Sequence, residues 1–467
     1  MSDASREPTP MPEALKGLDI APSVLDLVGR TPMVRLRKVE PHIATPVVAK
    51  LETANPGGSV KDRAAVAMID AAEADGLLQP GGVIVEPTSG NTGVGLAVVA
   101  AQRGYRCIFV CTDKVAPEKV ALLRAYGAEV VVCPVAVAPD DPRSYYSTAE
   151  RLRSETPGAY SPNQYGNPRN PRAHYETTGP EIWAQTEGRI THFVAGAGTG
   201  GTVAGVGRYL KEQDPGIQVV IADPPESVYV GGDGRPYLVE GIGEDFWPST
   251  YDPGVVDRGI PVTDAESFAM ARRVARREGL LIGGSGGTAV TGAFAVAAEL
   301  DAAGRSEESL VVTLIPDSGR GYLSRVFDDE WMAQMGFLPQ VPGPGTVSSL
   351  VHGEFVFVRP DDTVAAARRC MDRAGLRAVP VCTGEMPLAA AQVVGSVAQD
   401  GLLAVEGGAT VSAAIEPPLP AVGIGEPVGR IAELLVRADL LAGPEAVVVY
   451  DQGRPVATLG ADAIGGS

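Results

Sequence analysis

The residue types that build metal sites, disulfide frameworks and nucleic-acid surfaces are scarce in this 467-residue sequence. It has five cysteines and four histidines, and neither type recurs at a CxxC or metal-ligand spacing, so we expect no disulfide framework and no metal. Basic residues number 39 against 57 acidic ones, for a net charge of −18. A nucleic-acid or anionic-membrane partner needs a basic surface, so this balance argues against both.

The sequence also lacks long apolar runs and a secretory signal. No run is long enough to span a bilayer, and residues 1–20 are polar without the charged-then-apolar pattern of a signal peptide. We therefore expect a reduced, cytoplasmic protein. Aromatic residues make up only 5%, whereas glycine (57) and proline (39) are plentiful, so turns and close backbone approaches should be frequent.

The chain is too long for a single hydrophobic core, because such cores stop growing near about 250–300 residues. Up to Leu338, short Val/Ile runs alternate with helical patterns, as in GGVIVEPTSGN followed by TGVGLAVVAAQRGY. This alternation predicts parallel sheets covered by helices on both faces. We predict a first domain over residues 1–340, a Pro/Gly-rich linker over 341–350 and a second domain over 351–467.

The second domain contains two loosely similar stretches of about sixty residues each. Each shows a strand, a helix and two further strands, and Thr363 is the expected N-cap of the first helix. The pattern predicts a small α+β tandem-repeat module.

One lysine lies where a helix gains nothing from it. Lys61, in NPGGSVKDR, follows a glycine-rich turn and begins a predicted helix. The helix dipole favours anions at that end, so helix stability does not explain the residue. A Schiff base with a cofactor carbonyl would explain it, and a surface lysine in a turn is the alternative.

Two further glycine-containing turns precede helices. EPTSGNTG exposes amides and hydroxyls that suit a carboxylate, with a simple capping turn as the alternative. GLLIGGSGGTA presents Ser285, whose neutral hydroxyl suits a heteroaromatic nitrogen and which is otherwise a capping serine.

The run Gly196–Gly201 (GAGTGG) matches G-x-G-x-x-G between a strand and a helix. Asp223 ends the next predicted strand, where a ribose-binding acid of a dinucleotide site would lie. A lone phosphate would be held equally well by the same amides and by the hydroxyls of Thr199 and Thr202. The sequence leaves both ligands open.

Taken together, these segments resemble the fold-type II pyridoxal-phosphate family of cysteine synthases and cystathionine β-synthases. The resemblance covers about Val28 to Leu338 and rests on motifs in one order: GRTPMVRL, NPGGSVKDR, EPTSGNTG, NQYGNPRNPRAHYETTGPEI, GAGTGGT, VEGIGEDFWP, GGSGG and IPDSGRGYLSRVFDDEWM. It implies an α/β catalytic domain of two parallel-sheet subdomains that binds pyridoxal 5′-phosphate.

The resemblance also implies residue roles. Lys61 would form the internal aldimine and shuttle the substrate α-proton, Asn91 would contact the ring hydroxyl, and Ser285 would meet the pyridine nitrogen. The phosphate would be held by Gly198, Thr199, Gly200, Gly201 and Thr202. The substrate would be bound by Thr88, Ser89, Gly90, Thr92, Gln164, Tyr165, Glu240 and Gly241.

The implied reaction is condensation of L-serine with L-homocysteine to cystathionine through an aminoacrylate. Tyr165, the Glu240-containing loop VEGIGEDFWP and the segment DDEWMAQMGFL favour it over cysteine synthesis. The haem segment of some relatives is absent, so we expect no haem, while ADPPES leans toward the cysteine-synthase form. Alternatives are cysteine synthesis from O-acetylserine or O-phosphoserine plus sulfide, and a nicotinamide-dependent oxidoreductase.

The C-terminal pair resembles CBS-type regulatory repeats (a Bateman module), which implies an adenosyl ligand such as S-adenosylmethionine or AMP. Their usual Thr/Ser lies three residues before an Asp, but here Val397 precedes Asp400 and Leu459 precedes Asp462. The hydroxyls of Ser396 and Thr458 are displaced by one position, and a structural or dimerising module is the alternative. We further expect amino-acid substrates and a homodimer or higher homo-oligomer.

Overall fold

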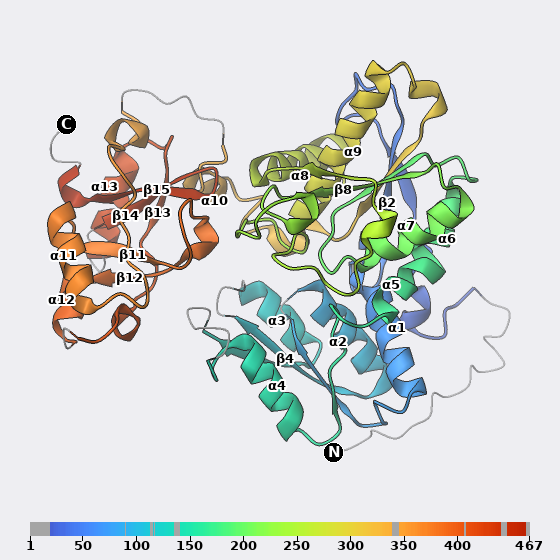
Figure 1. Ribbon diagram of the computed structural model, residues 1–467, viewed down its shortest axis with the longest axis horizontal. Helices are drawn as coiled ribbons and strands as arrows, with labels where there is room; N and C mark the ends of the chain where they lie inside the picture. The colour runs from blue at the N-terminus through green and yellow to red at the C-terminus, as the bar shows by residue number, and fades with distance from the viewer. Residues whose placement is uncertain are drawn as a thin grey trace. The chain divides into compact units, whose positions relative to one another are not determined.

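The computed structural model describes residues 19–88, 90–112, 115, 117–134, 141–338, 345–405, 408–439 and 446–463 (Figure 1). The chain divides into two compact units, Met1–Gly234 with Val239–Gly321 and Arg235–Leu238 with Tyr322–Ser467. The predicted linker at 341–350 lies partly outside the described residues. Within the described ranges, no helix is long and apolar enough to cross a bilayer.

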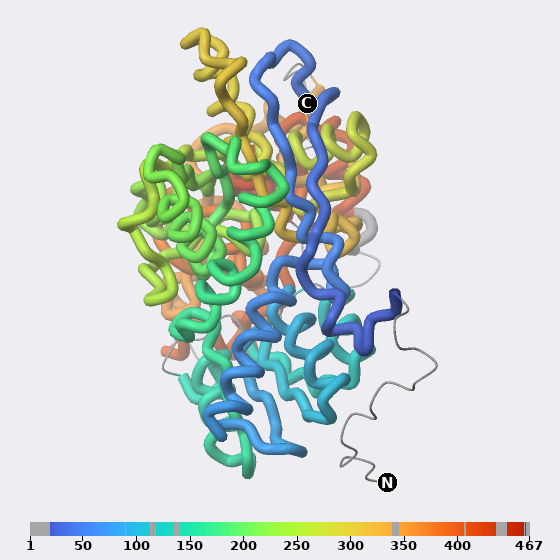
Figure 2. The backbone as a smooth tube through the Cα atoms, turned by 90° about the vertical axis from the view of Figure 1, so that its right-hand side faces the viewer, coloured from blue at the N-terminus to red at the C-terminus, as the bar shows by residue number. Residues whose placement is uncertain are grey.

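The larger sheet of the first unit has six strands in the order β1-β2-β10-β7-β8-β9. β1 and β2 form an antiparallel hairpin, the long blue pair of segments in Figure 2, and all other neighbours are parallel. The strands are β1 (Met33–Leu36), β2 (Val47–Leu51), β7 (His192–Ala195), β8 (Gln218–Asp223), β9 (Arg258–Pro261) and β10 (Val311–Ile315).

Helices cover both faces of this sheet, because its strands present apolar side chains to both sides. Phe193 and Ile221 share a core with residues of α6 and α7. On the opposite face α9 approaches so closely that a Cβ on Gly292 would lie 2.4 Å from the Cβ of Ala222. The helices here are α6 (Gly179–Gln185), α7 (Gly201–Gln213), α8 (Asp264–Glu278) and α9 (Gly284–Ala302).

The smaller sheet of the first unit is entirely parallel, in the order β5-β4-β3-β6. Cys107 and Cys111, four residues apart in one strand, are buried on the same face, which α1, α2 and α3 cover, whereas Val110 packs against α4. The elements are α1 (Lys61–Ala74), β3 (Val83–Pro87), α2 (Asn91–Arg103), β4 (Arg106–Thr112), α3 (Pro117–Ala125), β5 (Glu129–Cys133), α4 (Tyr145–Glu155) and β6 (Ala159–Tyr160). The predicted parallel sheets with helices on both faces are thus confirmed.

The second unit contains α10 (Asp329–Gln334) and two halves of similar topology. Val358 bridges Val381 in parallel, as β13 pairs with β14 in the other half, and Thr363 caps α11 as predicted. The first half contains α11 (Val364–Ala374), β11 (Ala378–Cys382), β12 (Val393–Ala398) and α12 (Gln399–Leu403). The second contains β13 (Ala421–Gly423), α13 (Gly429–Asp439), β14 (Ala446–Asp451) and β15 (Arg454–Gly460).

Each half of the second unit takes a short 3-10 helix from outside its own repeat. Val347, in η9 (Val347–Leu350), belongs to the core built by Val422 and Ile431 of the second half. Val411, in η11 (Val411–Ala414), belongs to the core of the first half. The two repeats are therefore interleaved rather than strung in series.

Candidate active site

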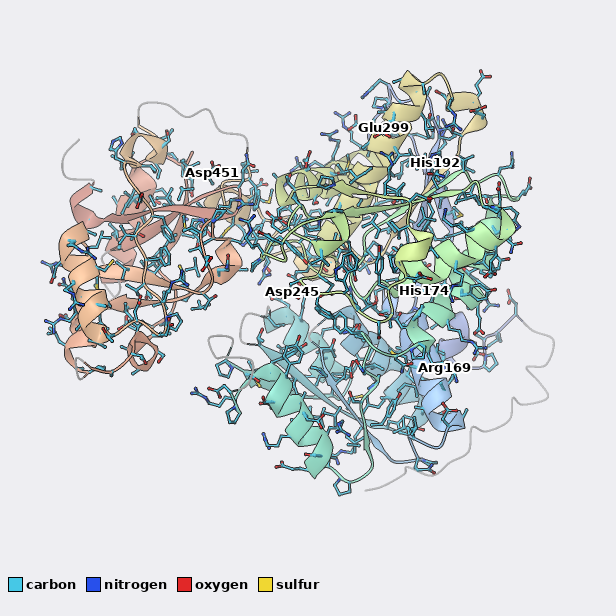
Figure 3. All side chains as sticks on the ribbon, viewed as in Figure 1. Arg169, His174, His192, Asp245, Glu299 and Asp451 are labelled. Atoms are coloured by element: carbon cyan, nitrogen blue, oxygen red, sulfur yellow. The ribbon has the colours of Figure 1, made fainter. Side chains whose placement is uncertain are left out.

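The predicted cofactor residues gather at the carboxyl edge of the larger sheet. Lys61 follows β2 and η3 (Glu52–Ala54), the run Gly198–Thr202 follows β7, and Asp317 follows β10. Because these neighbouring strands are parallel, their carboxyl ends meet at one edge, where α/β proteins bind ligands. Figure 3 labels His174 and Asp245 where the two subdomains of the first unit meet, and His192 and Glu299 at the far end of the larger one.

Asp317, which the sequence analysis did not single out, joins three parts of the site. Ser59, two residues before Lys61, forms a β-bridge with Asp317. Asn91 Nδ2 donates to Asp317 Oδ2 at 2.9 Å, and the Gly283 amide donates to the Asp317 carbonyl at 3.3 Å, which fixes the start of α9. The only signal in the sequence is an acid two residues after a buried strand.

Lys61 begins α1, as predicted, and its side chain is half-buried. Burial lowers the pKa of its amine, and the charges of Asp317 and Glu244 oppose that shift without cancelling it. A lowered pKa increases the neutral fraction of the amine. Neutral amine is the form that attacks a carbonyl, so the electrostatics suit the predicted role.

The predicted phosphate loop turns its carbonyl groups into the protein. Three successive carbonyls, beginning at Ala197, each accept a hydrogen bond from a fixed neighbour. The donors are the Gly243 amide to Ala197 (2.8 Å), the Tyr229 hydroxyl to Gly198 (2.7 Å) and the Thr250 hydroxyl to Thr199 (2.6 Å). The peptide planes of the loop are therefore held in one orientation.

With its carbonyls turned away, the loop leaves its amides available. Within the described residues, the amides of Gly198, Thr199, Gly200 and Thr202 donate to no acceptor. Gly200 is the left-handed N-cap of α7, with φ of 77°, and a Cβ there would lie 2.6 Å from the Cβ of Tyr251. Amides converging at a helix N-terminus form an anion site.

The rest of the loop is supported by buried polar side chains. Asn170 Nδ2 donates to Thr199 Oγ1 at 2.9 Å, and His174 Nε2 lies 3.3 Å from Thr202 Oγ1. Burial holds the pKa of His174 well below its usual value, so its imidazole is neutral. Its other ring nitrogen contacts the Thr178 hydroxyl at 2.9 Å.

Ser285 is buried in the first turn of α9. Its hydroxyl makes no hydrogen bond to any residue that the structure describes. A buried hydroxyl ordinarily has a hydrogen-bond partner, so the Ser285 hydroxyl is available to bond a ligand atom.

The predicted carboxylate site lies at the start of α2, whose N-cap is Gly90. Thr88 and Thr92 are buried there, and Thr92 Oγ1 donates to Gln164 Oε1 at 2.6 Å, so two of the predicted substrate residues touch. Ser89 lies outside the described residues.

Glu86, which the sequence analysis did not single out, holds the backbone of Gln164 in place. Its buried carboxylate accepts the amides of Asn163 and Gln164, each at 3.1 Å, and the Ser161 hydroxyl at 2.9 Å. Burial raises its pKa, and these hydrogen bonds oppose the shift. An acid within an otherwise apolar strand was the available signal.

Tyr165, Glu240 and Gly241 lie around the loop 239–247. The Tyr165 ring packs against Phe246, with centroids 5.4 Å apart. Gly241 has φ of 85°, and its carbonyl lies 2.7 Å from where a Cβ on Gly198 would be. Glu240 forms an ion pair with Lys119 of α3, so its contact with a substrate stays a prediction.

Asp223 supports the phosphate loop from inside the protein. It is fully buried, and its carboxylate accepts the Ala197 amide and the Ser227 hydroxyl, each at 2.9 Å. Burial raises its pKa to about 8 despite these bonds. Both oxygens are engaged within the protein, which counts against the ribose contact that the dinucleotide alternative requires.

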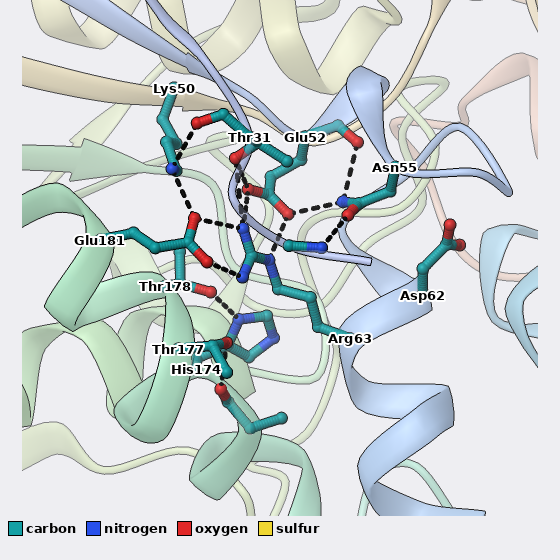
Figure 4. A network of polar contacts seen from close by, with 12 residues as sticks. Thr31, Lys50, Glu52, Asn55, Asp62, Arg63, His174, Thr177, Thr178 and Glu181 are labelled. Atoms are coloured by element: carbon teal, nitrogen blue, oxygen red, sulfur yellow. Dashed lines mark hydrogen bonds and ion pairs between the residues drawn. The ribbon is translucent and has the colours of Figure 1, made fainter. Parts of the chain in front are cut away.

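A buried ion cluster anchors the start of α1 (Figure 4). Arg63, two residues after Lys61, donates to Glu52 at 2.7 and 2.9 Å and to Glu181 at 2.7 and 2.9 Å. Lys50 Nζ donates to Glu181 at 2.6 Å. These two cations and two anions balance, as buried charges require. The cluster fixes the direction from which Lys61 enters the site.

The displaced hydroxyls of the C-terminal repeats hold the two halves together. Ser396 donates to the Pro417 carbonyl at 2.6 Å, and Thr458 donates to the Val356 carbonyl at 2.7 Å. Asp400 is exposed, and the side chain of Asp462 lies outside the described part of the chain. Both hydroxyls are thus committed to contacts between the repeats.

The first unit fits pyridoxal 5′-phosphate. It offers an amide cradle for the phosphate, an amine of lowered pKa for the carbonyl, and a buried hydroxyl that lacks a described partner. Acidic side chains do not enter the amide cradle in the described residues, so the fit holds electrostatically.

Comparisons with known proteins agree. The family model "Pyridoxal-phosphate dependent enzyme" matches residues 24–317, and the "CBS domain" model matches residues 347–407. Cystathionine β-synthase of Apis mellifera is 44% identical over 329 residues, 69% of this chain and 64% of that protein. The enzyme of the same name from Dictyostelium discoideum is 40% identical over 378 residues, 78% of this chain and 75% of that one.

A solved structure described as an O-acetylserine-dependent cystathionine β-synthase from Helicobacter pylori is also similar. Its TM-score is 0.60 at 37% identity, over 66% of this chain and 98% of that one. The chain spans less than two thirds of the length of the Apis mellifera relative. With its α/β first unit and its C-terminal repeats, the chain belongs to the fold-type II family of pyridoxal-phosphate-dependent enzymes and carries a CBS domain.

Proposed function

We propose that this chain catalyses a β-replacement in which L-serine and L-homocysteine form cystathionine and water. In the net reaction the serine Cβ–O bond breaks and a Cβ–S bond forms, while the thiol proton leaves with the hydroxyl as water. The observation that carries the proposal is that Asp317 joins Ser59, two residues before Lys61, to Asn91 at the start of α2. The amide cradle at 198–202 follows β7, the strand next to β10 in the same sheet. The names of the relatives support it.

When bound, pyridoxal 5′-phosphate supplies the electron sink that acidifies the α-proton of an attached amino acid. In our proposal the amides of Gly198–Thr202 bind its phosphate, Asn91 meets the ring hydroxyl, and Ser285 donates to or accepts from the ring nitrogen without adding charge. Lys61 holds the cofactor and then accepts the α-proton at Nζ. Its lowered pKa keeps the amine ready for that proton transfer.

The substrate carboxylate is assigned to the start of α2. Thr88, Ser89, Gly90, Thr92 and Gln164 would orient it through amide and hydroxyl donors, with the Thr92–Gln164 bond fixing two of them. With the cofactor held at the amide cradle and the substrate carboxylate held at the start of α2, the substrate would present its α-proton to Lys61.

The test uses the purified holoenzyme. L-serine alone should change the visible spectrum of the bound cofactor, and added L-homocysteine should yield cystathionine by mass spectrometry. Lys61→Ala should abolish both, whereas Lys211→Ala, at an exposed ion pair, should not. Full turnover by Lys61→Ala would refute the role of Lys61.

A different leaving group is the second candidate, because the Helicobacter pylori protein is described as O-acetylserine-dependent. If L-serine is inert while O-acetylserine and homocysteine give cystathionine, only the leaving group changes. If O-acetylserine or O-phosphoserine reacts with sulfide alone, the chain is a cysteine synthase.

Two predictions about partners stay open to test. Adenosyl binding by the C-terminal unit would raise its unfolding temperature when S-adenosylmethionine or AMP is added. The committed hydroxyls of Ser396 and Thr458 favour the structural alternative. Assembly as a homodimer or higher homo-oligomer would give a corresponding mass in sedimentation.

A further inference from the structure

The loop 239–247 fixes one acidic residue beside the predicted catalytic lysine. The Val228 amide donates to the Glu244 carbonyl at 3.0 Å, and the Glu244 amide donates to Ser227 Oγ at 3.4 Å. The preceding Gly243 amide holds the phosphate loop through Ala197. The backbone at Glu244 is therefore built into the same framework as the cradle.

The Glu244 side chain is half-buried. Its charge acts on Lys61, and its carboxylate lies against the Tyr165 hydroxyl. Burial raises its pKa to about 7, with Asp245 adding to the shift and Tyr165 and Lys61 opposing it. The titratable groups that interact electrostatically with it are Lys61, Tyr145, Tyr146, Tyr165, Asp223 and Asp245.

A carboxylate in this position needs a cation. Among the described residues Glu244 forms no ion pair, unlike Glu240, whose charge is met by Lys119. In the proposed reaction Lys61 first holds the cofactor and then carries the α-proton, so it gives Glu244 no permanent counter-charge. A half-buried carboxylate without a cation is costly, so a cation brought by a substrate would be bound there.

The site already provides for the anionic part of its first substrate at the start of α2. A second anion beside Glu244, such as hydrosulfide, would be repelled. A thiol that carries an ammonium group would be attracted and also oriented. The adjoining rings of Tyr165 and Phe246 offer apolar surface for its methylene groups.

We infer that Glu244 is a specificity-determining residue that binds the α-ammonium group of the nucleophile and selects an amino-acid thiol over sulfide. The inference rests on the proposed function. It assigns to Glu244 the contact with the second substrate that the sequence suggested for Glu240.

The experiment compares nucleophiles that differ by one group. Holoenzyme is supplied with L-serine and, in turn, L-homocysteine, 4-mercaptobutanoate (homocysteine without its ammonium) or sulfide. The variant is Glu244→Gln, which keeps the shape and an acceptor for Tyr165. The control is Asp245→Asn, which removes a neighbouring exposed charge from the same loop.

Wild type should use homocysteine at least about tenfold better than 4-mercaptobutanoate in kcat/KM, since one charge-assisted hydrogen bond distinguishes them. Glu244→Gln should remove most of that ratio through KM for homocysteine, with sulfide use unchanged or improved. The spectral response to L-serine alone should be unaltered, which a merely misfolded site would not allow. Asp245→Asn should retain the ratio within about threefold.

Two failures are distinguishable. If wild type makes no cystathionine from homocysteine, the proposed function fails whatever Glu244 does. If wild type makes cystathionine but Glu244→Gln loses activity equally with all three nucleophiles, or keeps the full ratio, the inference alone is overturned.

Discussion

Glu244 and Glu181 are two carboxyl groups of the first unit whose pKa values shift in opposite directions. Burial dominates at Glu244 and raises its pKa to about 7. Burial also acts at Glu181, but hydrogen bonds and charges from Arg63 and Lys50 outweigh it and lower the pKa to about 2. The difference lies in the nearby cations. Glu181 contacts both Arg63 and Lys50, whereas Glu244 is influenced only by Lys61.

The ionisation of Glu244 should make nucleophile choice depend on pH. Only the carboxylate form attracts an ammonium, so the kcat/KM ratio of homocysteine to 4-mercaptobutanoate should rise between pH 6 and 8, by up to about tenfold. Both thiols stay mostly protonated below pH 8, so their thiolate fractions rise in parallel with pH and cancel in the ratio. A ratio that is flat in wild type, or that still rises in Glu244→Gln, would contradict the assignment.

Glu181→Gln should destabilise the first unit by about 3 kcal/mol at pH 7, because two buried cations lose their shared carboxylate. A depressed pKa contributes stability above the unfolded value near 4.5 that is lost as pH falls toward 2. The deficit in urea unfolding should therefore shrink below pH 4.5. Glu299→Gln, at an exposed ion pair with Arg258, should change stability by less than about 1 kcal/mol.

At the scale of elements, the loop before α7 depends on a left-handed glycine. Gly200→Ala adds a methyl group that would meet Tyr251 and strains a φ of 77°, so the amides of the cradle should shift. We expect at least about tenfold weaker binding of pyridoxal 5′-phosphate to the apoenzyme.

The matched control is Gly104→Ala at the left-handed C-cap of α2, where a Cβ would meet nothing within 4 Å. It should cost about 1 kcal/mol of stability and leave cofactor binding unchanged. Equal losses of cofactor in both variants would show that Gly200 acts only through stability.

The sequence predicts a feature well when the residues that form it are neighbours in the chain. The sequence could predict the strands and helices, Lys61 and the run Gly196–Gly201, because the hydrophobic period, the turn or the motif that indicates each of them lies within a few consecutive residues. Asp317, Glu86 and Glu244 are ordinary acids in their own segments, and their importance arises only where distant strands meet. Asp223 was misleading for the same reason, since its spacing fits a ribose contact but its carboxylate is buried.

At the scale of the whole molecule, the two units have separate hydrophobic cores. Calorimetry of the full-length holoenzyme should therefore show two unfolding transitions. Removing pyridoxal 5′-phosphate should lower only the one that belongs to the first unit, by several degrees, because a ligand stabilises the fold that binds it. A single transition that shifts as a whole would show that the units unfold together.

Because η9 and η11 are exchanged between the C-terminal repeats, each repeat completes the hydrophobic core of the other. Neither repeat owns all of its core, so neither can be cut away and leave the other as a viable fragment. Recombination should therefore exchange residues 347 to 460 as one block, and insertions or deletions that separate the two repeats should be rare. Point changes on the outer surfaces should accumulate freely.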